Sequence, residues 1–131
     1  MFKNRKRKIA VALTAAMLLG SVCVGNVGAY APTVSGYANG VLCTGYATLS
    51  DKAGTAYTSC GSYGTLHAKA TYYYYVNGKP KNSYRSADNS DYSVTAVVNN
   101  PGSDGAFKTE GKHSVYCSDG YWGEYTTEIL K

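Results

Sequence analysis

Hydrophobic and polar positions alternate over most of the chain beyond residue 40, which is the pattern of β-strands with one buried face. In the segment 41–49 the odd-numbered positions are Val, Cys, Gly, Ala and Leu, and the even-numbered ones include two threonines and a tyrosine. In the segment 65–76 the even-numbered positions are apolar or aromatic, and the odd-numbered ones carry the polar groups and two more tyrosines. We therefore expect a strand in each segment. The length and the two aromatic faces of the second place it centrally in a sheet.

Turn-forming residues separate further strands. Polar or glycine-containing segments at 51–54, 61–64 and 99–102 predict turns on either side of strands at 55–60 and 92–98. Ser118-Asp119-Gly120 is a tight-turn sequence, and it joins the clearest hairpin of the chain, formed by 112–117 and 121–130. Asn77-Gly78 ends the central strand, and the polar segment Lys79–Asp91 contains Pro80. We expect this segment to be a loop with at most a short edge strand around Tyr84.

Six or seven short strands at this spacing indicate an all-β fold, a small antiparallel sandwich or barrel. Aliphatic residues are few after the N-terminal segment, and tyrosine, a strand former with a large ring, replaces them in the core. The face of the central strand that begins with Leu66 is the more apolar one, so Tyr72 and Tyr74 should be core residues. Tyr73 and Tyr75 should point outward.

The first thirty residues have the features of a secretory signal peptide. A basic block at residues 3–8 precedes an uncharged apolar run from Ile9 to Val24, which is shorter than a bilayer span and ends in small residues. Two cleavage sites fit, and the one before Tyr30 avoids a proline after the scissile bond. We expect a signal peptide at 1–29 and one secreted domain at 30–131, with no stable membrane span after processing. A lipoprotein would need a very small residue before Cys23, where Val22 stands.

Removal of the signal peptide changes the charge of the chain. Five of the 13 Lys and Arg residues lie in the basic block, which leaves eight against the 8 Asp and Glu residues. The mature domain is therefore nearly neutral, and its composition does not support nucleic-acid binding, which needs a basic surface. We expect the domain to be extracellular or associated with the cell surface.

Three cysteines remain after processing, namely Cys43, Cys60 and Cys117. An oxidising compartment permits disulfides, but three cysteines cannot all pair. If the strands at 41–49 and 55–60 form a hairpin, Cys43 and Cys60 lie nearly opposite each other, and we predict that disulfide. The rival pair is Cys60 with Cys117. In the predicted pairing Cys117 is left over, either as a buried inert thiol or as a link between two protomers of a homodimer.

No motif of a known catalytic or metal site is present. His67 and His113 are the only histidines, and neither has the cysteine or histidine spacing of a zinc site. Asp88–Asp91 and Asn99–Asp104 offer oxygen ligands without the spacing of a calcium loop. We expect no enzyme activity, cofactor or metal. A small extracellular hydrolase stays an alternative, because His67 and acidic residues can converge in space.

Aromatic side chains are the chemically distinctive feature of the domain. Tyrosine and tryptophan rings that do not fit into a single core stay at the surface. There they can stack on sugars or contribute to protein binding. The expected ligand-binding residues are His67, Tyr73, Tyr75, Tyr121, Trp122 and Tyr125. They predict a secreted binding protein whose partner is a cell-surface glycan, a cell-wall precursor or a protein.

Two short stretches resemble a known family. His67-Ala68-Lys69-Ala70-Thr71, followed by Gly120-Tyr121-Trp122-Gly123, is similar to the ordered sequence features of lactococcin-type secreted bacteriocins. The resemblance implies a β-sandwich and a non-enzymatic partner at the cell envelope, such as a cell-wall precursor. It adds an alternative function, antagonism of the envelope of related bacteria.

Overall fold

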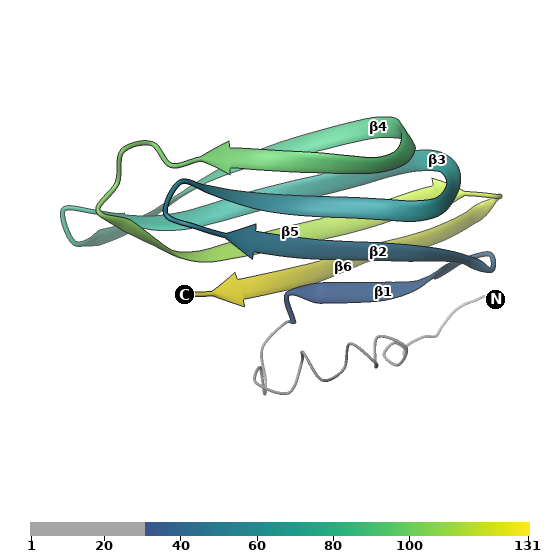
Figure 1. Ribbon diagram of the computed structural model, residues 1–131, viewed down its shortest axis with the longest axis horizontal. Helices are drawn as coiled ribbons and strands as arrows, with labels where there is room; N and C mark the ends of the chain where they lie inside the picture. The colour runs from purple at the N-terminus through teal and green to yellow at the C-terminus, as the bar shows by residue number, and fades with distance from the viewer. Residues whose placement is uncertain (1–30) are drawn as a thin grey trace.

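The computed structural model describes residues 31–131, so the expected signal peptide, its cleavage site and Cys23 lie outside the described residues. The described part is all-β, as expected, and its six strands form one antiparallel sheet (Figure 1). The strands are β1 (Thr33–Ala38), β2 (Val41–Leu49), β3 (Ala53–Val76), β4 (Lys79–Asn99), β5 (Gly105–Cys117) and β6 (Gly120–Leu130). No helix among residues 31–131 is long and apolar enough to cross a membrane.

The sheet folds over on itself because its two longest strands bend. The register between β3 and β4 shifts between Ser59 and Gly64, and both strands turn back at this point (Figure 1). We call the resulting layers A and B. Layer A contains β1, β2, residues 53–60 of β3 and residues 93–99 of β4, whereas layer B contains residues 64–76 of β3, residues 79–91 of β4, β5 and β6.

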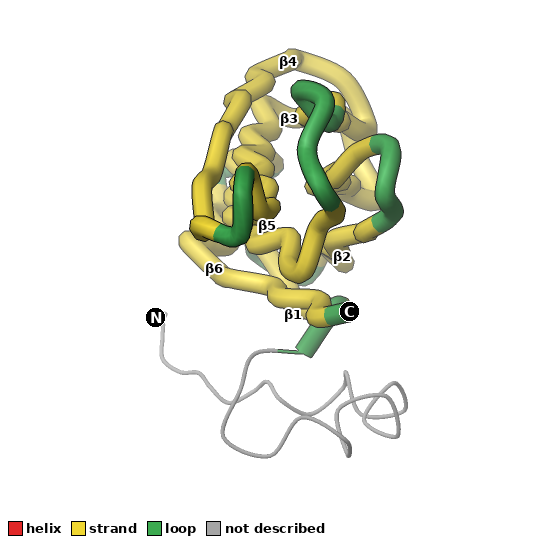
Figure 2. The backbone as a smooth tube through the Cα atoms, turned by 90° about the vertical axis from the view of Figure 1, so that its left-hand side faces the viewer, coloured by secondary structure: helices red, strands yellow, loops and turns green. Residues whose placement is uncertain are grey.

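The sheet is nearly closed, with a barrel-like shape around its core (Figure 2). On one side β4 passes from layer A to layer B through its own bend. On the other side β1 approaches β6, and the backbone N–H of Glu128 donates to the carbonyl of Ala31 at 2.9 Å. The core lies between the two layers.

The two layers contribute different side chains to the core. Layer B supplies most of the large buried ones, including Tyr72, Leu66 and His113, each of which is fully buried. Layer A opposes them with small residues, and the layers approach most closely at glycines. A Cβ atom on Gly45 would collide with the His113 ring, and one on Gly54 would lie 2.5 Å from the Tyr72 ring.

Several predicted elements are confirmed. The strand 41–49 is β2, and the strand 92–98 ends β4. The last hairpin turns through Ser118 and Asp119, which both have positive φ, as the tight two-residue turn requires. Tyr72 and Tyr74 are buried, and Tyr75 is 41% exposed, so the alternation along the central strand is confirmed there. Tyr73 is half-buried on the outer side.

The loop predicted for Lys79–Asp91 is wrong. This segment is the first part of β4, and it pairs with the central strand from Val76↔Lys79 to Gly64↔Asp91. It forms an edge of layer B, so most of its side chains are exposed, and the segment lacks the buried face that periodicity detects. Its polar composition is that of an edge strand, and Pro80 lies next to the strand's start.

The turn expected at 61–64 is a bend within one strand. Residues 55–60 and 65–76 both belong to β3, and they lie in opposite layers instead of pairing with each other. Glycine allows the close approach at this bend, because a Cβ atom on Gly64 would lie 2.6 Å from the carbonyl oxygen of Tyr116.

Candidate ligand-binding face

The outer face of layer B brings together two of the aromatic residues expected from sequence, Tyr73 and Tyr75, with others that were not expected. In the register of the sheet, Tyr73 lies beside Asn82 and Lys108, and Thr71 lies beside Tyr84 and Glu110. Residues directly opposite in antiparallel strands point to the same side of the sheet. We use the name tyrosine face for the group Lys69, Tyr73, Tyr75, Tyr84, Phe107 and Lys108.

The rings of the tyrosine face pack against each other and against cations. The Phe107 ring lies 4.6 Å from the Tyr75 ring and 6.0 Å from the Tyr73 ring, measured between centroids. The Lys108 ammonium lies 4.4 Å from the Tyr73 ring centroid, and the Lys69 ammonium lies 4.5 Å from that of Tyr84. These contacts hold the rings in fixed positions, which lowers the entropy cost of binding a flat ligand.

Carboxylates border the tyrosine face. Lys108 forms an ion pair with Glu128 at 3.2 Å, and the Tyr73 hydroxyl donates to Glu110 at 3.5 Å. Burial, followed by the charge of Glu110, raises the pKa of Tyr73. Burial alone would lower the pKa of Lys108, but the hydrogen bond and the charge of Glu128 raise it overall. At neutral pH the Tyr73 phenol is therefore neutral and the neighbouring Lys108 ammonium is charged.

His67 lies on the same outer side of layer B, three rows from Tyr73. Its Nδ1 atom lies 2.6 Å from a carboxylate oxygen of Asp88 on β4. On its other side, His67 is directly opposite Ser114 of β5. The convergence of His67 with an acidic residue, on which the hydrolase alternative depends, is thus present in the structure.

The expected site residues of the last hairpin do not gather beside Tyr73. Tyr121 is 51% exposed on the outer side of layer B, but it pairs with Tyr116 opposite Thr65, at the far end of the sheet. The Tyr116 and Tyr121 rings lie 5.2 Å apart. The outer side of layer B therefore has two aromatic groups with a polar middle that contains His67.

Trp122 is not a surface residue, and the expectation that it contributes to an exposed face is wrong. It is 3% exposed and packs over Gly36 of layer A, where a Cβ atom would lie 2.5 Å from its indole nitrogen. Tyr125 is partly buried and its ring lies 5.0 Å from that of Trp122. The register shifts between His113 and Val115, so simple alternation does not predict which side of β6 faces the core.

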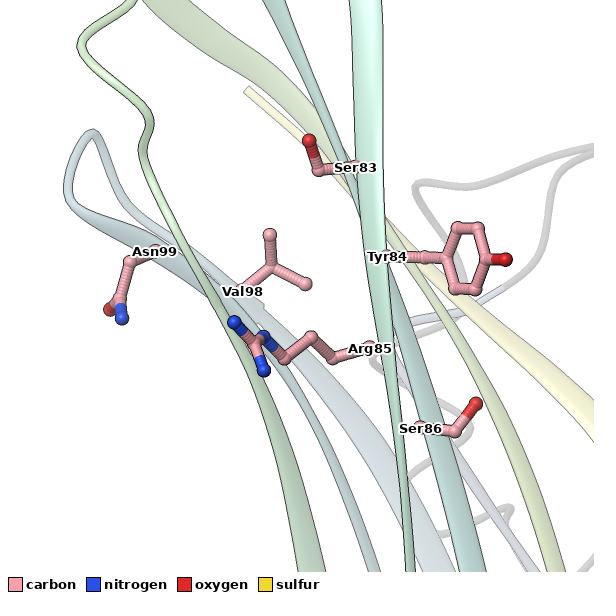
Figure 3. Close-up of a pocket in the computed structure, with 6 residues that line it drawn as sticks. All are labelled: Ser83, Tyr84, Arg85, Ser86, Val98 and Asn99. Carbon is pink, nitrogen blue, oxygen red and sulfur yellow. The ribbon is translucent and has the colours of Figure 1, made fainter.

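A groove lies between the two halves of β4 (Figure 3). Its volume is about 500 Å³. Ser83 and Arg85 point into the groove toward Val98, while Tyr84 points to the opposite side of the same strand (Figure 3). One edge strand thus presents a tyrosine on the outer face and a guanidinium in the groove.

The three cysteines form a buried cluster at the bend of β3. Cys43 is directly opposite Cys60, as expected, with 3.9 Å between the sulfur atoms. Cys117 Sγ is closer, 3.0 Å from Cys60 Sγ. The three sulfur atoms lie within 4.8 Å of one another, and the structure contains all three as free thiols. This is the group of side chains in the described residues that could hold a metal ion.

His113 is a core residue. Its Nδ1 atom lies 2.9 Å from the Thr58 hydroxyl and its Nε2 atom lies 2.8 Å from the Thr127 hydroxyl, so both layers hold the ring. Burial lowers the pKa of His113 to about 4. The imidazole is therefore neutral at physiological pH and fully occupied by hydrogen bonds, which is a structural role.

Sequence reasoning missed Tyr84, Phe107 and Tyr116 as members of the outer surface. Tyr84 lies in the segment for which the sequence predicts a loop with at most a short edge strand, and Phe107 lies at a register shift between β3 and β5, where alternation fails. Tyr116 could have been found, because the predicted hairpin already paired it with Tyr121. Comparisons with protein-family models, curated proteins and solved structures find no match to this chain.

Proposed function

We propose that this chain is a secreted, non-enzymatic binding protein that acts at the bacterial cell surface or in the extracellular space. The tyrosine face supports the proposal best, and we infer that it binds a glycan. Tyr84 is 63% exposed and Tyr75 is 41% exposed, and both lie on one side of a sheet with charged hydrogen-bonding groups beside them. Flat rings bordered by such groups suit the apolar face and the hydroxyl groups of a sugar.

Binding to an insoluble polysaccharide tests the proposal. Purified peptidoglycan sacculi are the first probe, and chitin is a chemically related second one. The double variant Tyr75→Ala, Tyr84→Ala should bind sacculi about tenfold or more weakly than the parent, because each ring contact contributes roughly 0.5–1.5 kcal/mol.

The matched control is Tyr37→Ala, since Tyr37 is 61% exposed but belongs to layer A. This control should bind like the parent protein. Equal loss in the control and in the double variant would contradict the assignment to the tyrosine face. Absence of binding to both polysaccharides would contradict glycan binding and leave a protein partner as the ligand to seek.

The bacteriocin alternative shares the envelope partner and adds antagonism. Its support is the resemblance of His67–Thr71 and Gly120–Gly123 to lactococcin-type bacteriocins. Growth inhibition of related strains by purified protein, lost together with sacculus binding in the double variant, would favour it over passive binding. Binding without inhibition would exclude it for the strains tested.

A hydrolase is the second candidate, and one observation favours it. Asp88, His67 and Ser114 lie in one row across β4, β3 and β5, with the carboxylate on Nδ1 of the imidazole. This is the order of groups that orients a histidine as a base for a hydroxyl nucleophile. Release of soluble sugars or peptides from sacculi, abolished by both His67→Ala and Ser114→Ala, would establish it. Binding without release would remove it.

A further inference from the structure

The three buried cysteines give the chain one more thiol than a disulfide needs, and their arrangement is unequal. Cys60 is the central member, with Cys117 Sγ at 3.0 Å and Cys43 Sγ at 3.9 Å. The two pairs connect different parts of the fold. Cys43 and Cys60 are neighbours within layer A, whereas Cys60 and Cys117 join the bend of β3 to the end of β5 in layer B.

We propose that the exported protein carries a Cys60–Cys117 disulfide, with Cys43 held beside it as a buried reduced thiol. The proposal rests on the proposed export, since disulfides persist in oxidising compartments. It favours the pair Cys60–Cys117 over the pair Cys43–Cys60, which is the disulfide predicted from the sequence. Two facts carry it: the shorter sulfur distance, and the position of Cys117 against Gly64, where a Cβ atom would lie 2.7 Å from Cys117 Cβ.

The chemistry of the cluster favours a neutral product over a bound metal. The surroundings are apolar, with Ala38, Leu66 and Val115 in the same core and no charged residue in the strands of layer A. Three thiolates around a zinc or copper ion would carry a net negative charge, which is costly to bury unpaired. A disulfide with one thiol carries no charge.

The oxidation is balanced by a disulfide-bearing oxidant of the export compartment. The Cys60 thiolate attacks a sulfur of the oxidant, forms a mixed disulfide and releases one thiol. The Cys117 thiolate then attacks Cys60 Sγ, which forms the internal bond and releases the second thiol. Because all three cysteines are buried in the folded chain, this step precedes the closure of the core.

Cys43 is the thiol that remains. An exchange in which its sulfur attacks Cys60 and releases Cys117 balances without an external reagent, so the protein could in principle hold either bond. Burial raises the pKa of Cys43 far above its usual value, which removes the thiolate that such an attack needs. The folded protein therefore keeps the bond between the layers.

Peptide mapping decides the pairing. The full chain with Cys23→Ala is refolded from urea in a glutathione redox buffer, blocked with N-ethylmaleimide and digested with trypsin. Cleavage after Lys52, Lys69 and Lys112 puts the three cysteines in separate peptides. We expect peptide 53–69 linked to peptide 113–131, and an alkylated Cys43. A link between 53–69 and the Cys43 peptide, or three alkylated cysteines, would overturn the proposal whether or not the chain is exported.

Two variants give an independent readout that does not depend on mapping. Cys43→Ala keeps both partners of the proposed bond, whereas the double variant Cys43→Ala, Cys117→Ala leaves Cys60 as the one thiol of the cluster. Reduction should lower the urea midpoints of the parent and of Cys43→Ala, with a roughly thousandfold change in the unfolding constant for a loop of this length. The midpoint of the double variant should not respond to reductant. A Cys43→Ala midpoint that does not respond to reductant, or one equivalent of zinc or copper on three reduced thiols in protein recovered from the medium, would refute the assignment.

Discussion

Layers A and B of the sheet differ in both of their faces. The strands of layer A contain no charged residue, and their inward side chains are mostly small, with Gly45 and Gly54 at the closest approaches. Layer B carries every charged residue of the strands and supplies Tyr72, Leu66 and His113 to the core. Layer B therefore provides both the bulk of the core and the chemically varied surface, and the small inward residues of layer A make room for its large side chains.

The difference between the layers is tested most strongly by removing a large buried side chain from layer B. Tyr72→Ala should destabilise the fold by about 3–5 kcal/mol, because truncation of a buried aromatic leaves a cavity. Tyr72 is fully buried, and its hydroxyl donates to the Ser50 carbonyl at 2.8 Å. Tyr75→Ala, on the outer side of the same strand, should cost less than about 1 kcal/mol. Urea unfolding of the two variants provides the measurement, and equal losses would mean that layer B is buried on both sides.

The next test uses pH. The folded pKa of His113, about 4, lies below its ordinary value of 6.5, so the unfolded chain takes up the proton first as the pH falls. The contribution of His113 to the free energy of unfolding is fully present above pH 6.5, and it falls by about 3 kcal/mol as the pH is lowered toward 4. His113→Gln should be less stable at neutral pH but should lose this part of the slope. A parent protein equally stable at pH 7 and pH 4.5 would contradict the buried neutral imidazole.

A smaller effect is expected when bulk is added to layer A. Gly45→Ala should destabilise by roughly 1–3 kcal/mol, because the new methyl group meets the His113 ring. Gly61→Ala is the matched control, since its Cβ atom would meet only ordinary contacts, the nearest at 3.5 Å. Thermal melts of both variants measure the difference. A neutral Gly45→Ala would show that the layers can separate without cost.

The smallest effect concerns the outer surface of layer B. Asp88→Asn should change the free energy of unfolding by less than about 1 kcal/mol, because the carboxylate that contacts His67 is 70% exposed. Urea unfolding of the variant and of the parent protein provides the measurement. A loss of several kcal/mol would contradict a weak, solvent-exposed pair.

Much of layer B's inner pattern could be read from the sequence. The alternation from Leu66 to Val76 correctly separated Tyr72 and Tyr74 from Tyr75, because a buried face repeats every second residue. The final hairpin was equally clear, since Ser118-Asp119-Gly120 contains the turn chemistry that the backbone needs. Local sequence decides these features, so they are visible without the fold.

What could not be predicted depends on contacts between distant segments. The edge strand at 79–91 has no buried face of its own, and only pairing with β3 defines it. Trp122 turns inward because of the register shift between His113 and Val115, which alternation does not signal. The tyrosine face needs β3, β4 and β5 side by side, so only the two rings on β3 were expected there. The sequence shows that segments 33–49, 53–63 and 93–99 contain no charged residue. Only the structure shows that these segments lie together, in layer A and at the bend of β3.

Since β4 pairs only with β3 within residues 31–131, it leaves a long backbone edge exposed to other molecules. The first part of this edge is protected against self-association by Pro80 and by charged side chains such as Lys81, Arg85 and Asp88. The second part, residues 93–99, is rich in valine and has no charge, and Val97 is 39% exposed. Fibril growth by this protein should therefore start at Ser93–Asn99, and a single lysine at position 97 should delay it.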